Sequence, residues 1–268
     1  MSNINQKIRR KAEVKAKAQE PSSIFGLCRV IGCGKPTRAA TSDGLDKKFC
    51  RSHAEHYQRH GSPYKRSYTA NEVNPYRQAA LLWIEDHEED WWVQAALANV
   101  RGLYRDAGPH IEAFRLRGLT PRERANAAWA RLSKGKVDPK LVVAAGISVE
   151  MIIQDDPQPD LSREFRLVQS AKLVHRLASG SHKKWTREVP DPAWGGARTK
   201  TVTEEMHVYP RPRGRVLRVM GDDIEEAIAL LVQHHLAAAQ AFKAERDKSG
   251  SHSDRPTPKK RGARDNNG

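Results

Sequence analysis

The sequence predicts a mainly α-helical protein with a small β-hairpin, in which an N-terminal zinc module precedes a helical domain compatible with a winged helix-turn-helix. Three observations support this prediction. All three cysteines lie near the start of the chain beside a histidine with metal-ligand spacing. Segments with helix caps and helical apolar spacing fill the middle, and one later segment alternates with the period of strands.

Composition bounds the size of the protein and the class of its partners. A chain of 268 residues accommodates one medium domain or two small ones with tails. The net charge of +15 and isoelectric point near 9.9 favour a phosphate polyanion, so we expect DNA, with RNA as the alternative. The sequence has no run of 18 apolar residues and no secretory signal, and its cysteines fit a reducing compartment. We therefore expect a cytoplasmic protein with no membrane partner.

Residues 1–22 form a polar, basic arm, and residues 23–70 form the predicted zinc module. Its four ligands follow the spacing C-x4-C-x16-C-x2-H and are Cys28, Cys33, Cys50 and His53. Zn²⁺ favours four such ligands, as two close pairs joined by a longer loop, and four protein ligands are typical of a structural site. The residues between the pairs are polar and turn-forming, so a metal would hold the segment where burial cannot. His56 and His60 are alternatives to His53.

These residues also match a known kind of module. The segments Cys28–Pro36, Phe49–His53 and Tyr57–Pro63 resemble a small zinc-binding module at the front of many phage and bacterial HNH-type endonucleases and other mobile-element proteins. The resemblance covers about residues 24–68 and implies zinc and a nucleic-acid context. No His-Asn-His constellation follows later in the chain, so the resemblance does not extend to the nuclease.

Helix signals begin the helical domain, residues 71–245. Asn74 and Pro75 predict an N-cap and a first helical position. Thr120–Glu123 is a capping box, and Asp138–Pro139 predicts a further helix start. Residues 161–178 have the apolar spacing of a longer helix.

The segment Leu141–Ile152 resembles the turn of a helix-turn-helix. Gly146 would end one helix, Ile147 would fill the core, and Ser148 would cap a second helix that reads DNA. Arg122 and Arg124 would then lie near phosphates. An ordinary pair of bundle helices is the alternative.

Residues 184–219 alternate with a period near two and predict a hairpin around a loop at 190–196, with Val216–Val219 as a third strand. This basic hairpin would act as a wing on the DNA backbone, or would be an ordinary solvated hairpin.

The last helix is expected to start at about Asp222. Its apolar stripe consists of Ile224, Ile228, Leu231, His235, Ala238 and Phe242. This stripe could pair two copies of the chain in a homodimer. The basic, polar residues 246–268 are expected to be disordered.

Together these patterns predict a zinc-containing DNA-binding protein, a regulatory or accessory factor of a phage or mobile genetic element. The predicted nucleic-acid contacts are basic and lie in the module and hairpin: Arg29, Lys35, Arg38, Lys47, Lys48, Arg51, Arg59, Lys65, Arg66, Lys183, Lys184, Arg187, Arg198, Lys200, Arg211, Arg213 and Arg215. One alternative is a divergent metal-dependent nuclease that uses Glu85, Asp86, Glu89 and Asp90. Another is a zinc-stabilised dimerisation factor.

Overall fold

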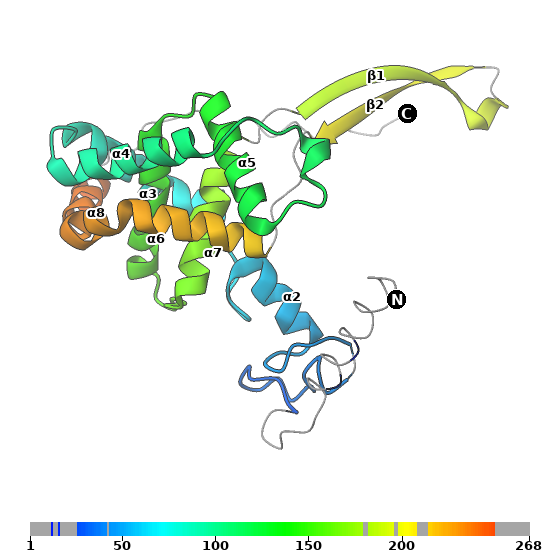
Figure 1. Ribbon diagram of the computed structural model, residues 1–268, viewed down its shortest axis with the longest axis horizontal. Coiled ribbons are helices and arrows are strands. Elements are labelled where there is room, and N and C mark those ends of the chain that lie inside the picture. The colour runs from blue at the N-terminus through cyan, green and yellow to red at the C-terminus, as the bar shows by residue number, and fades with distance from the viewer. Residues whose placement is uncertain are drawn as a thin grey trace, which may run out of the picture.

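The computed structural model describes residues 12, 16, 26–41, 43–178, 182–195, 198–207 and 214–249. The helices are α2 (Arg51–His60), α3 (Ala70–Asp86), α4 (Trp91–Asp106), α5 (Pro121–Lys134), α6 (Pro139–Asp155), α7 (Arg163–Arg176) and α8 (Arg215–Lys248). Short 3-10 turns are η1 (Ala113–Leu116) and η2 (Pro192–Trp194), and the strands are β1 (His182–Pro190) and β2 (Thr199–His207). This confirms a mainly helical fold with a small hairpin (Figure 1).

The two ends of the chain fall largely beyond what the structure describes. The predicted arm over 1–22 lies outside the described residues except for Ala12 and Ala16. The predicted tail over 246–268 overlaps the end of α8, which continues to Lys248, and residues 250–268 lie outside the described part. Within the described ranges, no helix has both the length and the apolar character needed to cross a bilayer.

Local capping chemistry starts several helices where the sequence predicts them. Thr120 accepts from the backbone N–H of Glu123, whose side chain accepts in return from the N–H of Thr120, and α5 begins there as predicted. Asp138 likewise caps α6 by accepting from Lys140 N–H at 2.9 Å. The predicted start of α3 at Asn74 is wrong. Thr69 caps this helix through its own capping box, and Pro75 lies inside it.

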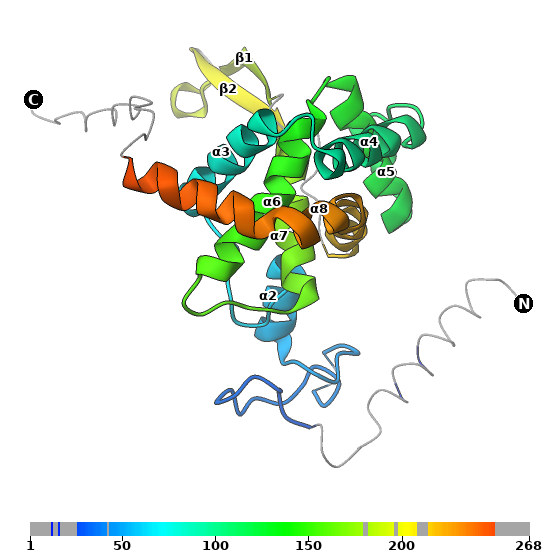
Figure 2. The same ribbon diagram turned by 90° about the vertical axis from the view of Figure 1, so that its left-hand side faces the viewer.

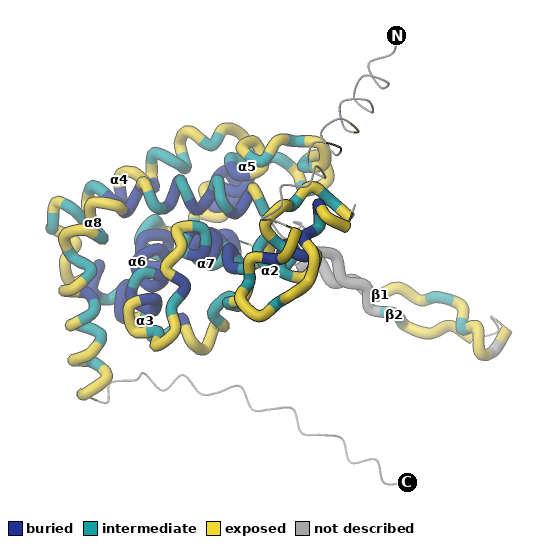
Figure 3. The backbone as a smooth tube through the Cα atoms, turned by 90° about the horizontal axis from the view of Figure 1, so that it is seen from below, coloured by how far each residue is buried: buried dark blue, intermediate teal, exposed yellow. Residues whose placement is uncertain are grey.

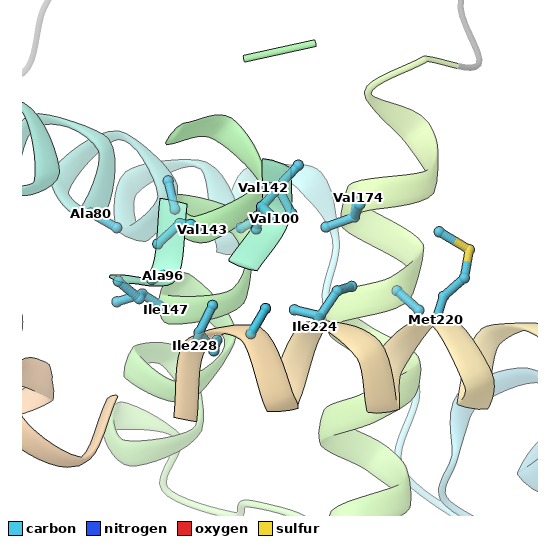
Figure 4. Packing of buried hydrophobic residues seen from close by; sticks show 14 of the residues in the cluster. Ala80, Ala96, Val100, Val142, Val143, Ile147, Val174, Met220, Ile224 and Ile228 are labelled. Carbon is cyan, nitrogen blue, oxygen red and sulfur yellow. The ribbon is translucent and has the colours of Figure 1, made fainter. Parts of the chain in front are cut away.

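Helix α8 crosses the other helices and contributes to one core with all of α3 to α7 (Figure 2). Figure 4 shows Met220, Ile224 and Ile228 of α8 facing Val142 and Ile147 of α6 and Val174 of α7. Ile224, Ile228 and Leu231 are each less than 5% exposed. The first half of the predicted stripe therefore lies in the chain's own core. Further along α8, His235 and Phe242 are half-buried and Ala238 is exposed.

The predicted helix-turn-helix is wrong, because α6 runs without a break from Pro139 to Asp155. Gly146 lies in its middle, where a Cβ atom would come within 2.5 Å of Ile228 Cδ1. The Ser148 hydroxyl donates to the carbonyl of Ala145 at 2.8 Å and does not cap a new helix. The glycine therefore permits close packing between α6 and α8 rather than a turn.

The hairpin is confirmed, but the third strand is wrong. Strands β1 and β2 pair antiparallel, with Arg187 opposite Val202 and Val189 opposite Lys200. Val216 and Leu217, assigned to a third strand, lie in the first turn of α8 and are buried in the core. Figures 1 and 3 show the hairpin projecting away from the helical body.

Candidate metal centre

Turns and one helix start bring the four predicted ligands together. The N–H of Cys28 donates to the carbonyl of Lys35 at 2.8 Å, which closes a loop around the first cysteine pair. Gly32 and Gly34 have positive φ angles of 77° and 59°, which favour glycine on either side of Cys33. Cys50 is the N-cap residue of α2 and His53 lies in its first turn, so both side chains sit on one side of the helix start.

The four donor atoms form a compact group. The Sγ atom of Cys28 lies 3.3 Å from His53 Nδ1, and that of Cys50 lies 3.4 Å from the same nitrogen. The sulfurs of Cys33 and Cys50 are 3.8 Å apart, and all four atoms lie within 4.8 Å of one another. Among the described residues, this is the one group of three or more metal-ligating side chains with such geometry. These four residues are therefore close enough to hold one metal ion.

Electrostatics around Cys50 favour the thiolate, which is the form that binds metal. Burial raises the pKa of Cys50, but hydrogen bonds from the Ser52 hydroxyl and the backbone of His53 outweigh it and lower that pKa to about 6. Cys28 and Cys50 are buried, while Cys33 and His53 are half-buried. The centre is thus shielded on one side.

The two alternative histidines have other partners. His56 Nδ1 lies 2.8 Å from the carbonyl oxygen of Ser62, and His60 Nδ1 accepts from the N–H of Ser67 at 2.9 Å. Burial is the main cause that lowers the pKa of His60 to about 4. Neither ring belongs to the four-residue group, so His53 is the histidine that completes it.

A polar joint attaches the far end of α2 to the helical body. Arg218 of α8 donates to the carbonyl of Tyr57 at 3.3 Å, stacks over the Tyr57 ring at 5.1 Å and pairs with Glu164. Gln169 of α7 donates to the carbonyl of His60 at 3.0 Å. The Tyr57 carbonyl therefore accepts from Arg218 as well as from the N–H of the C-cap residue Gly61, at 2.9 Å. Gln169 supplies a donor to the His60 carbonyl, at the end of the helix where carbonyls lack a helical partner. Figure 1 shows that the loops carrying Cys28 and Cys33 lie toward the opposite end of this helix.

Sequence reasoning missed this joint. Arg218 stands in a basic stretch after the hairpin and resembles a phosphate contact, while Gln169 is an unremarkable polar residue in α7. Their partners lie more than 100 residues earlier, so no local spacing connects them.

The predicted nucleic-acid contacts of the module divide into two groups. Lys35 and Lys48 are exposed and have no ion-pair partner among the residues that the structure describes, and Arg29 and Lys47 are also exposed. Arg38, by contrast, donates to the carbonyl of Asp43 at 2.7 Å and is half-buried.

Four further basic residues follow along the module. Arg51 and Arg59 are exposed and each pair with Glu55 at 3.4 Å and 3.3 Å. Arg66 is exposed and pairs with Glu72 at 3.3 Å. Lys65 is half-buried and pairs with Asp156 of the helical body, so its charge is engaged within the chain.

The hairpin contributes a second basic group, away from the module. Arg187, Arg198 and Lys200 are exposed, and Lys200 Nζ lies 3.7 Å from Asp191. Lys183 and Lys184 lie in β1, and the exposed Arg215 opens α8. Arg211 and Arg213 lie outside the described residues. Figures 1 and 2 show the hairpin and the module extending from different parts of the body.

The acidic run proposed for a nuclease does not assemble a metal site. Glu85 and Asp86 end α3 and Glu89 lies in the turn before α4, and all three are exposed. Asp90 caps α4 by accepting from the N–H groups of Trp92 and Val93. The run therefore behaves as a solvated turn and a helix cap.

Comparison with known protein families, with curated proteins and with solved structures finds no match for this chain.

Proposed function

We propose that this protein is a zinc-containing DNA-binding protein, a regulatory or accessory factor of a phage or other mobile genetic element. The observation that carries the proposal is the Cys28, Cys33, Cys50 and His53 group, set in a surface of exposed lysines and arginines. The metal would order the front of the chain, and the cations around it would bind phosphates.

The separations of the donor atoms fit zinc. Two sulfurs bound tetrahedrally to one Zn²⁺ at about 2.3 Å lie roughly 3.8 Å apart. Cys33 and Cys50 have that separation, and the shorter sulfur-to-nitrogen distances agree with a shorter Zn–N bond of about 2.0–2.1 Å. Three thiolates and one imidazole fill all four positions, which leaves none for a reacting water. Zinc would therefore hold the loops together and take no part in a reaction.

Charge supports a polyanion as the partner. The chain has a net charge of +15, and Lys35, Lys48, Arg187 and Arg198 are all exposed. The joint through Arg218 and Gln169 fixes the module on the body, and the hairpin extends from another part of it. Two separated basic elements on one body could contact one nucleic-acid molecule at two places.

The mobile-element context rests on the resemblance of residues 24–68 to a module of HNH-type endonucleases. Regulation or assistance of recombination, replication or packaging would suit a protein that binds and does not cut. We place the protein in the cytoplasm, where reduced cysteines remain available for zinc.

Salt dependence tests the proposal. Fluorescence anisotropy with labelled duplex DNA, single-stranded DNA and RNA, between 50 and 200 mM salt, should give a steep loss of affinity. The double variant Lys35→Ala/Lys48→Ala should reduce the slope of log K against log salt by about 2. Lys140→Ala is the matched control, because this lysine already pairs with Glu88 at 2.8 Å. Affinity that stays constant over this range, or no binding to any of the three ligands, would contradict the proposal.

A further inference from the structure

Deepening the proposed function, we propose that the segment joining α4 to α5 is a binding surface for single-stranded DNA, with Phe114 as a platform on which an unpaired base stacks. Phe114 lies in the 3-10 turn η1 and is 75% exposed. A phenylalanine so far out of the core offers most of its ring to a partner.

Positive charge is dense in the sequence on both sides of this ring. Between Arg101 and Lys136 the sequence has nine lysines and arginines against three acidic residues, a net charge of +6. Eight of the nine are exposed, namely Arg101, Arg105, Arg115, Arg117, Arg122, Arg124, Lys134 and Lys136. The end of α4, the connecting segment and the start of α5 therefore form one cationic stretch of chain.

Some of these basic side chains form ion pairs within the protein and others do not. Arg105 pairs with Asp106, and Arg122 pairs with Asp223. Arg101, Arg117 and Arg124 have no ion-pair partner among the residues that the structure describes. Their guanidinium groups are thus available to phosphates on the same stretch as the exposed ring.

Phe114 and its neighbour combine the two groups that a single strand requires. The Arg115 guanidinium lies 5.5 Å from the centre of the Phe114 ring. A ring for a base and cations for the backbone are the two elements by which proteins hold unpaired strands. A duplex keeps its bases stacked on one another and offers none to the ring.

A second exposed aromatic residue provides a contrast. Trp91 is 66% exposed, but it follows an acidic stretch, with Glu85 at the end of α3 and Glu88 and Glu89 in the turn after it. Carboxylates there would repel a polyanion. The same kind of side chain is therefore suited to a nucleic acid at Phe114 and not at Trp91.

The test compares four variants in anisotropy titrations with a labelled thymidine oligonucleotide and with a duplex. Phe114→Ala should weaken binding of the oligonucleotide by about 5- to 100-fold, with an unchanged salt slope, because stacking carries no charge. Phe114→Tyr should keep the affinity. Arg117→Ala should weaken binding and reduce the salt slope by about 1. Trp91→Ala is the matched control and should bind like the wild type.

The outcomes separate this inference from the proposed function. A wild type that binds no nucleic acid would overturn both. A wild type that binds, with Phe114→Ala equal to Trp91→Ala, would overturn the platform and leave the proposed function in place. An equal loss for oligonucleotide and duplex would overturn the assignment to single strands. Thermal unfolding should be unchanged in Phe114→Ala, since the ring is exposed.

Discussion

The contact between α2 and the helical body can be tested at one glycine. Gly61 ends α2 with a φ angle of 78°, and a Cβ atom there would lie 2.4 Å from the carbonyl oxygen of Glu164 in α7. Gly61→Ala should therefore incur two penalties. A left-handed conformation costs a residue with a Cβ about 1–2 kcal/mol, and overpacking against a fixed backbone costs about 1–3 kcal/mol. The free energy of unfolding should fall by roughly 2–5 kcal/mol in total.

A second glycine isolates the steric part of this penalty. Gly108 has nearly the same φ angle, 76°, but a Cβ atom added there would have no heavy atom within 4 Å. Gly108→Ala should lose only the conformational part, about 1–2 kcal/mol. Urea unfolding monitored by tryptophan fluorescence measures both variants. Hydrogen exchange of the α2 amides would detect a module that detaches without global unfolding. Equal losses in the two variants, with unchanged exchange in α2, would refute the contact.

Buried groups of the helical body give three more predictions. Trp129 Nε1–H donates to Asp223 at 2.8 Å, and in Asp223→Ala it would lose this buried acceptor. The free energy of unfolding should therefore fall by about 2–4 kcal/mol. A urea midpoint like the wild type's would contradict this prediction. Burial lowers the pKa of His175 from 6.5 to about 3. As the pH falls, this histidine is therefore protonated in the unfolded chain before it is protonated in the folded one. Stability should then fall as the pH drops below 6.5, by up to about 1.4 kcal/mol per unit from this group, and His175→Gln should show a shallower fall in urea titrations between pH 7 and 4. The Leu231 side chain is 1% exposed in the core, so Leu231→Asp should abolish the cooperative thermal transition that circular dichroism measures. A variant that remains a folded monomer would count against that packing.

Local chemistry explains which parts of the fold could be predicted. The capping box at Thr120 and the cap at Asp138 act within three residues, so the sequence displays them directly. The metal-ligand group is similar, because its two pairs have short spacings and only one loop lies between them. The box at Thr69 and Glu72 is equally local, but Asn74 and Pro75 resemble a helix start more strongly.

Long-range packing explains what could not be predicted. Gly146 resembles a turn residue. Its lack of a side chain is explained by Ile224 and Ile228 of α8, which lie more than 75 positions later and pack against it inside the helix. Val216 and Leu217 are two consecutive apolar residues and so resemble part of a strand. In the structure they lie in α8 and are buried with Met220 in the core. Lys65 and Arg218 resemble phosphate contacts, and their carboxylate partners, Asp156 and Glu164, lie far away in the sequence.

The most direct measurement is the metal content of the purified protein, by elemental analysis and by native mass spectrometry. We expect one Zn²⁺ per chain, and we expect Cys50→Ser and His53→Ala to lose it while Lys140→Ala keeps it. Chelation should remove the order of the loops around Cys28 and Cys33, seen as lost amide dispersion in NMR spectra. A chain that carries no stoichiometric metal, or whose loops are unchanged after chelation, would contradict the account.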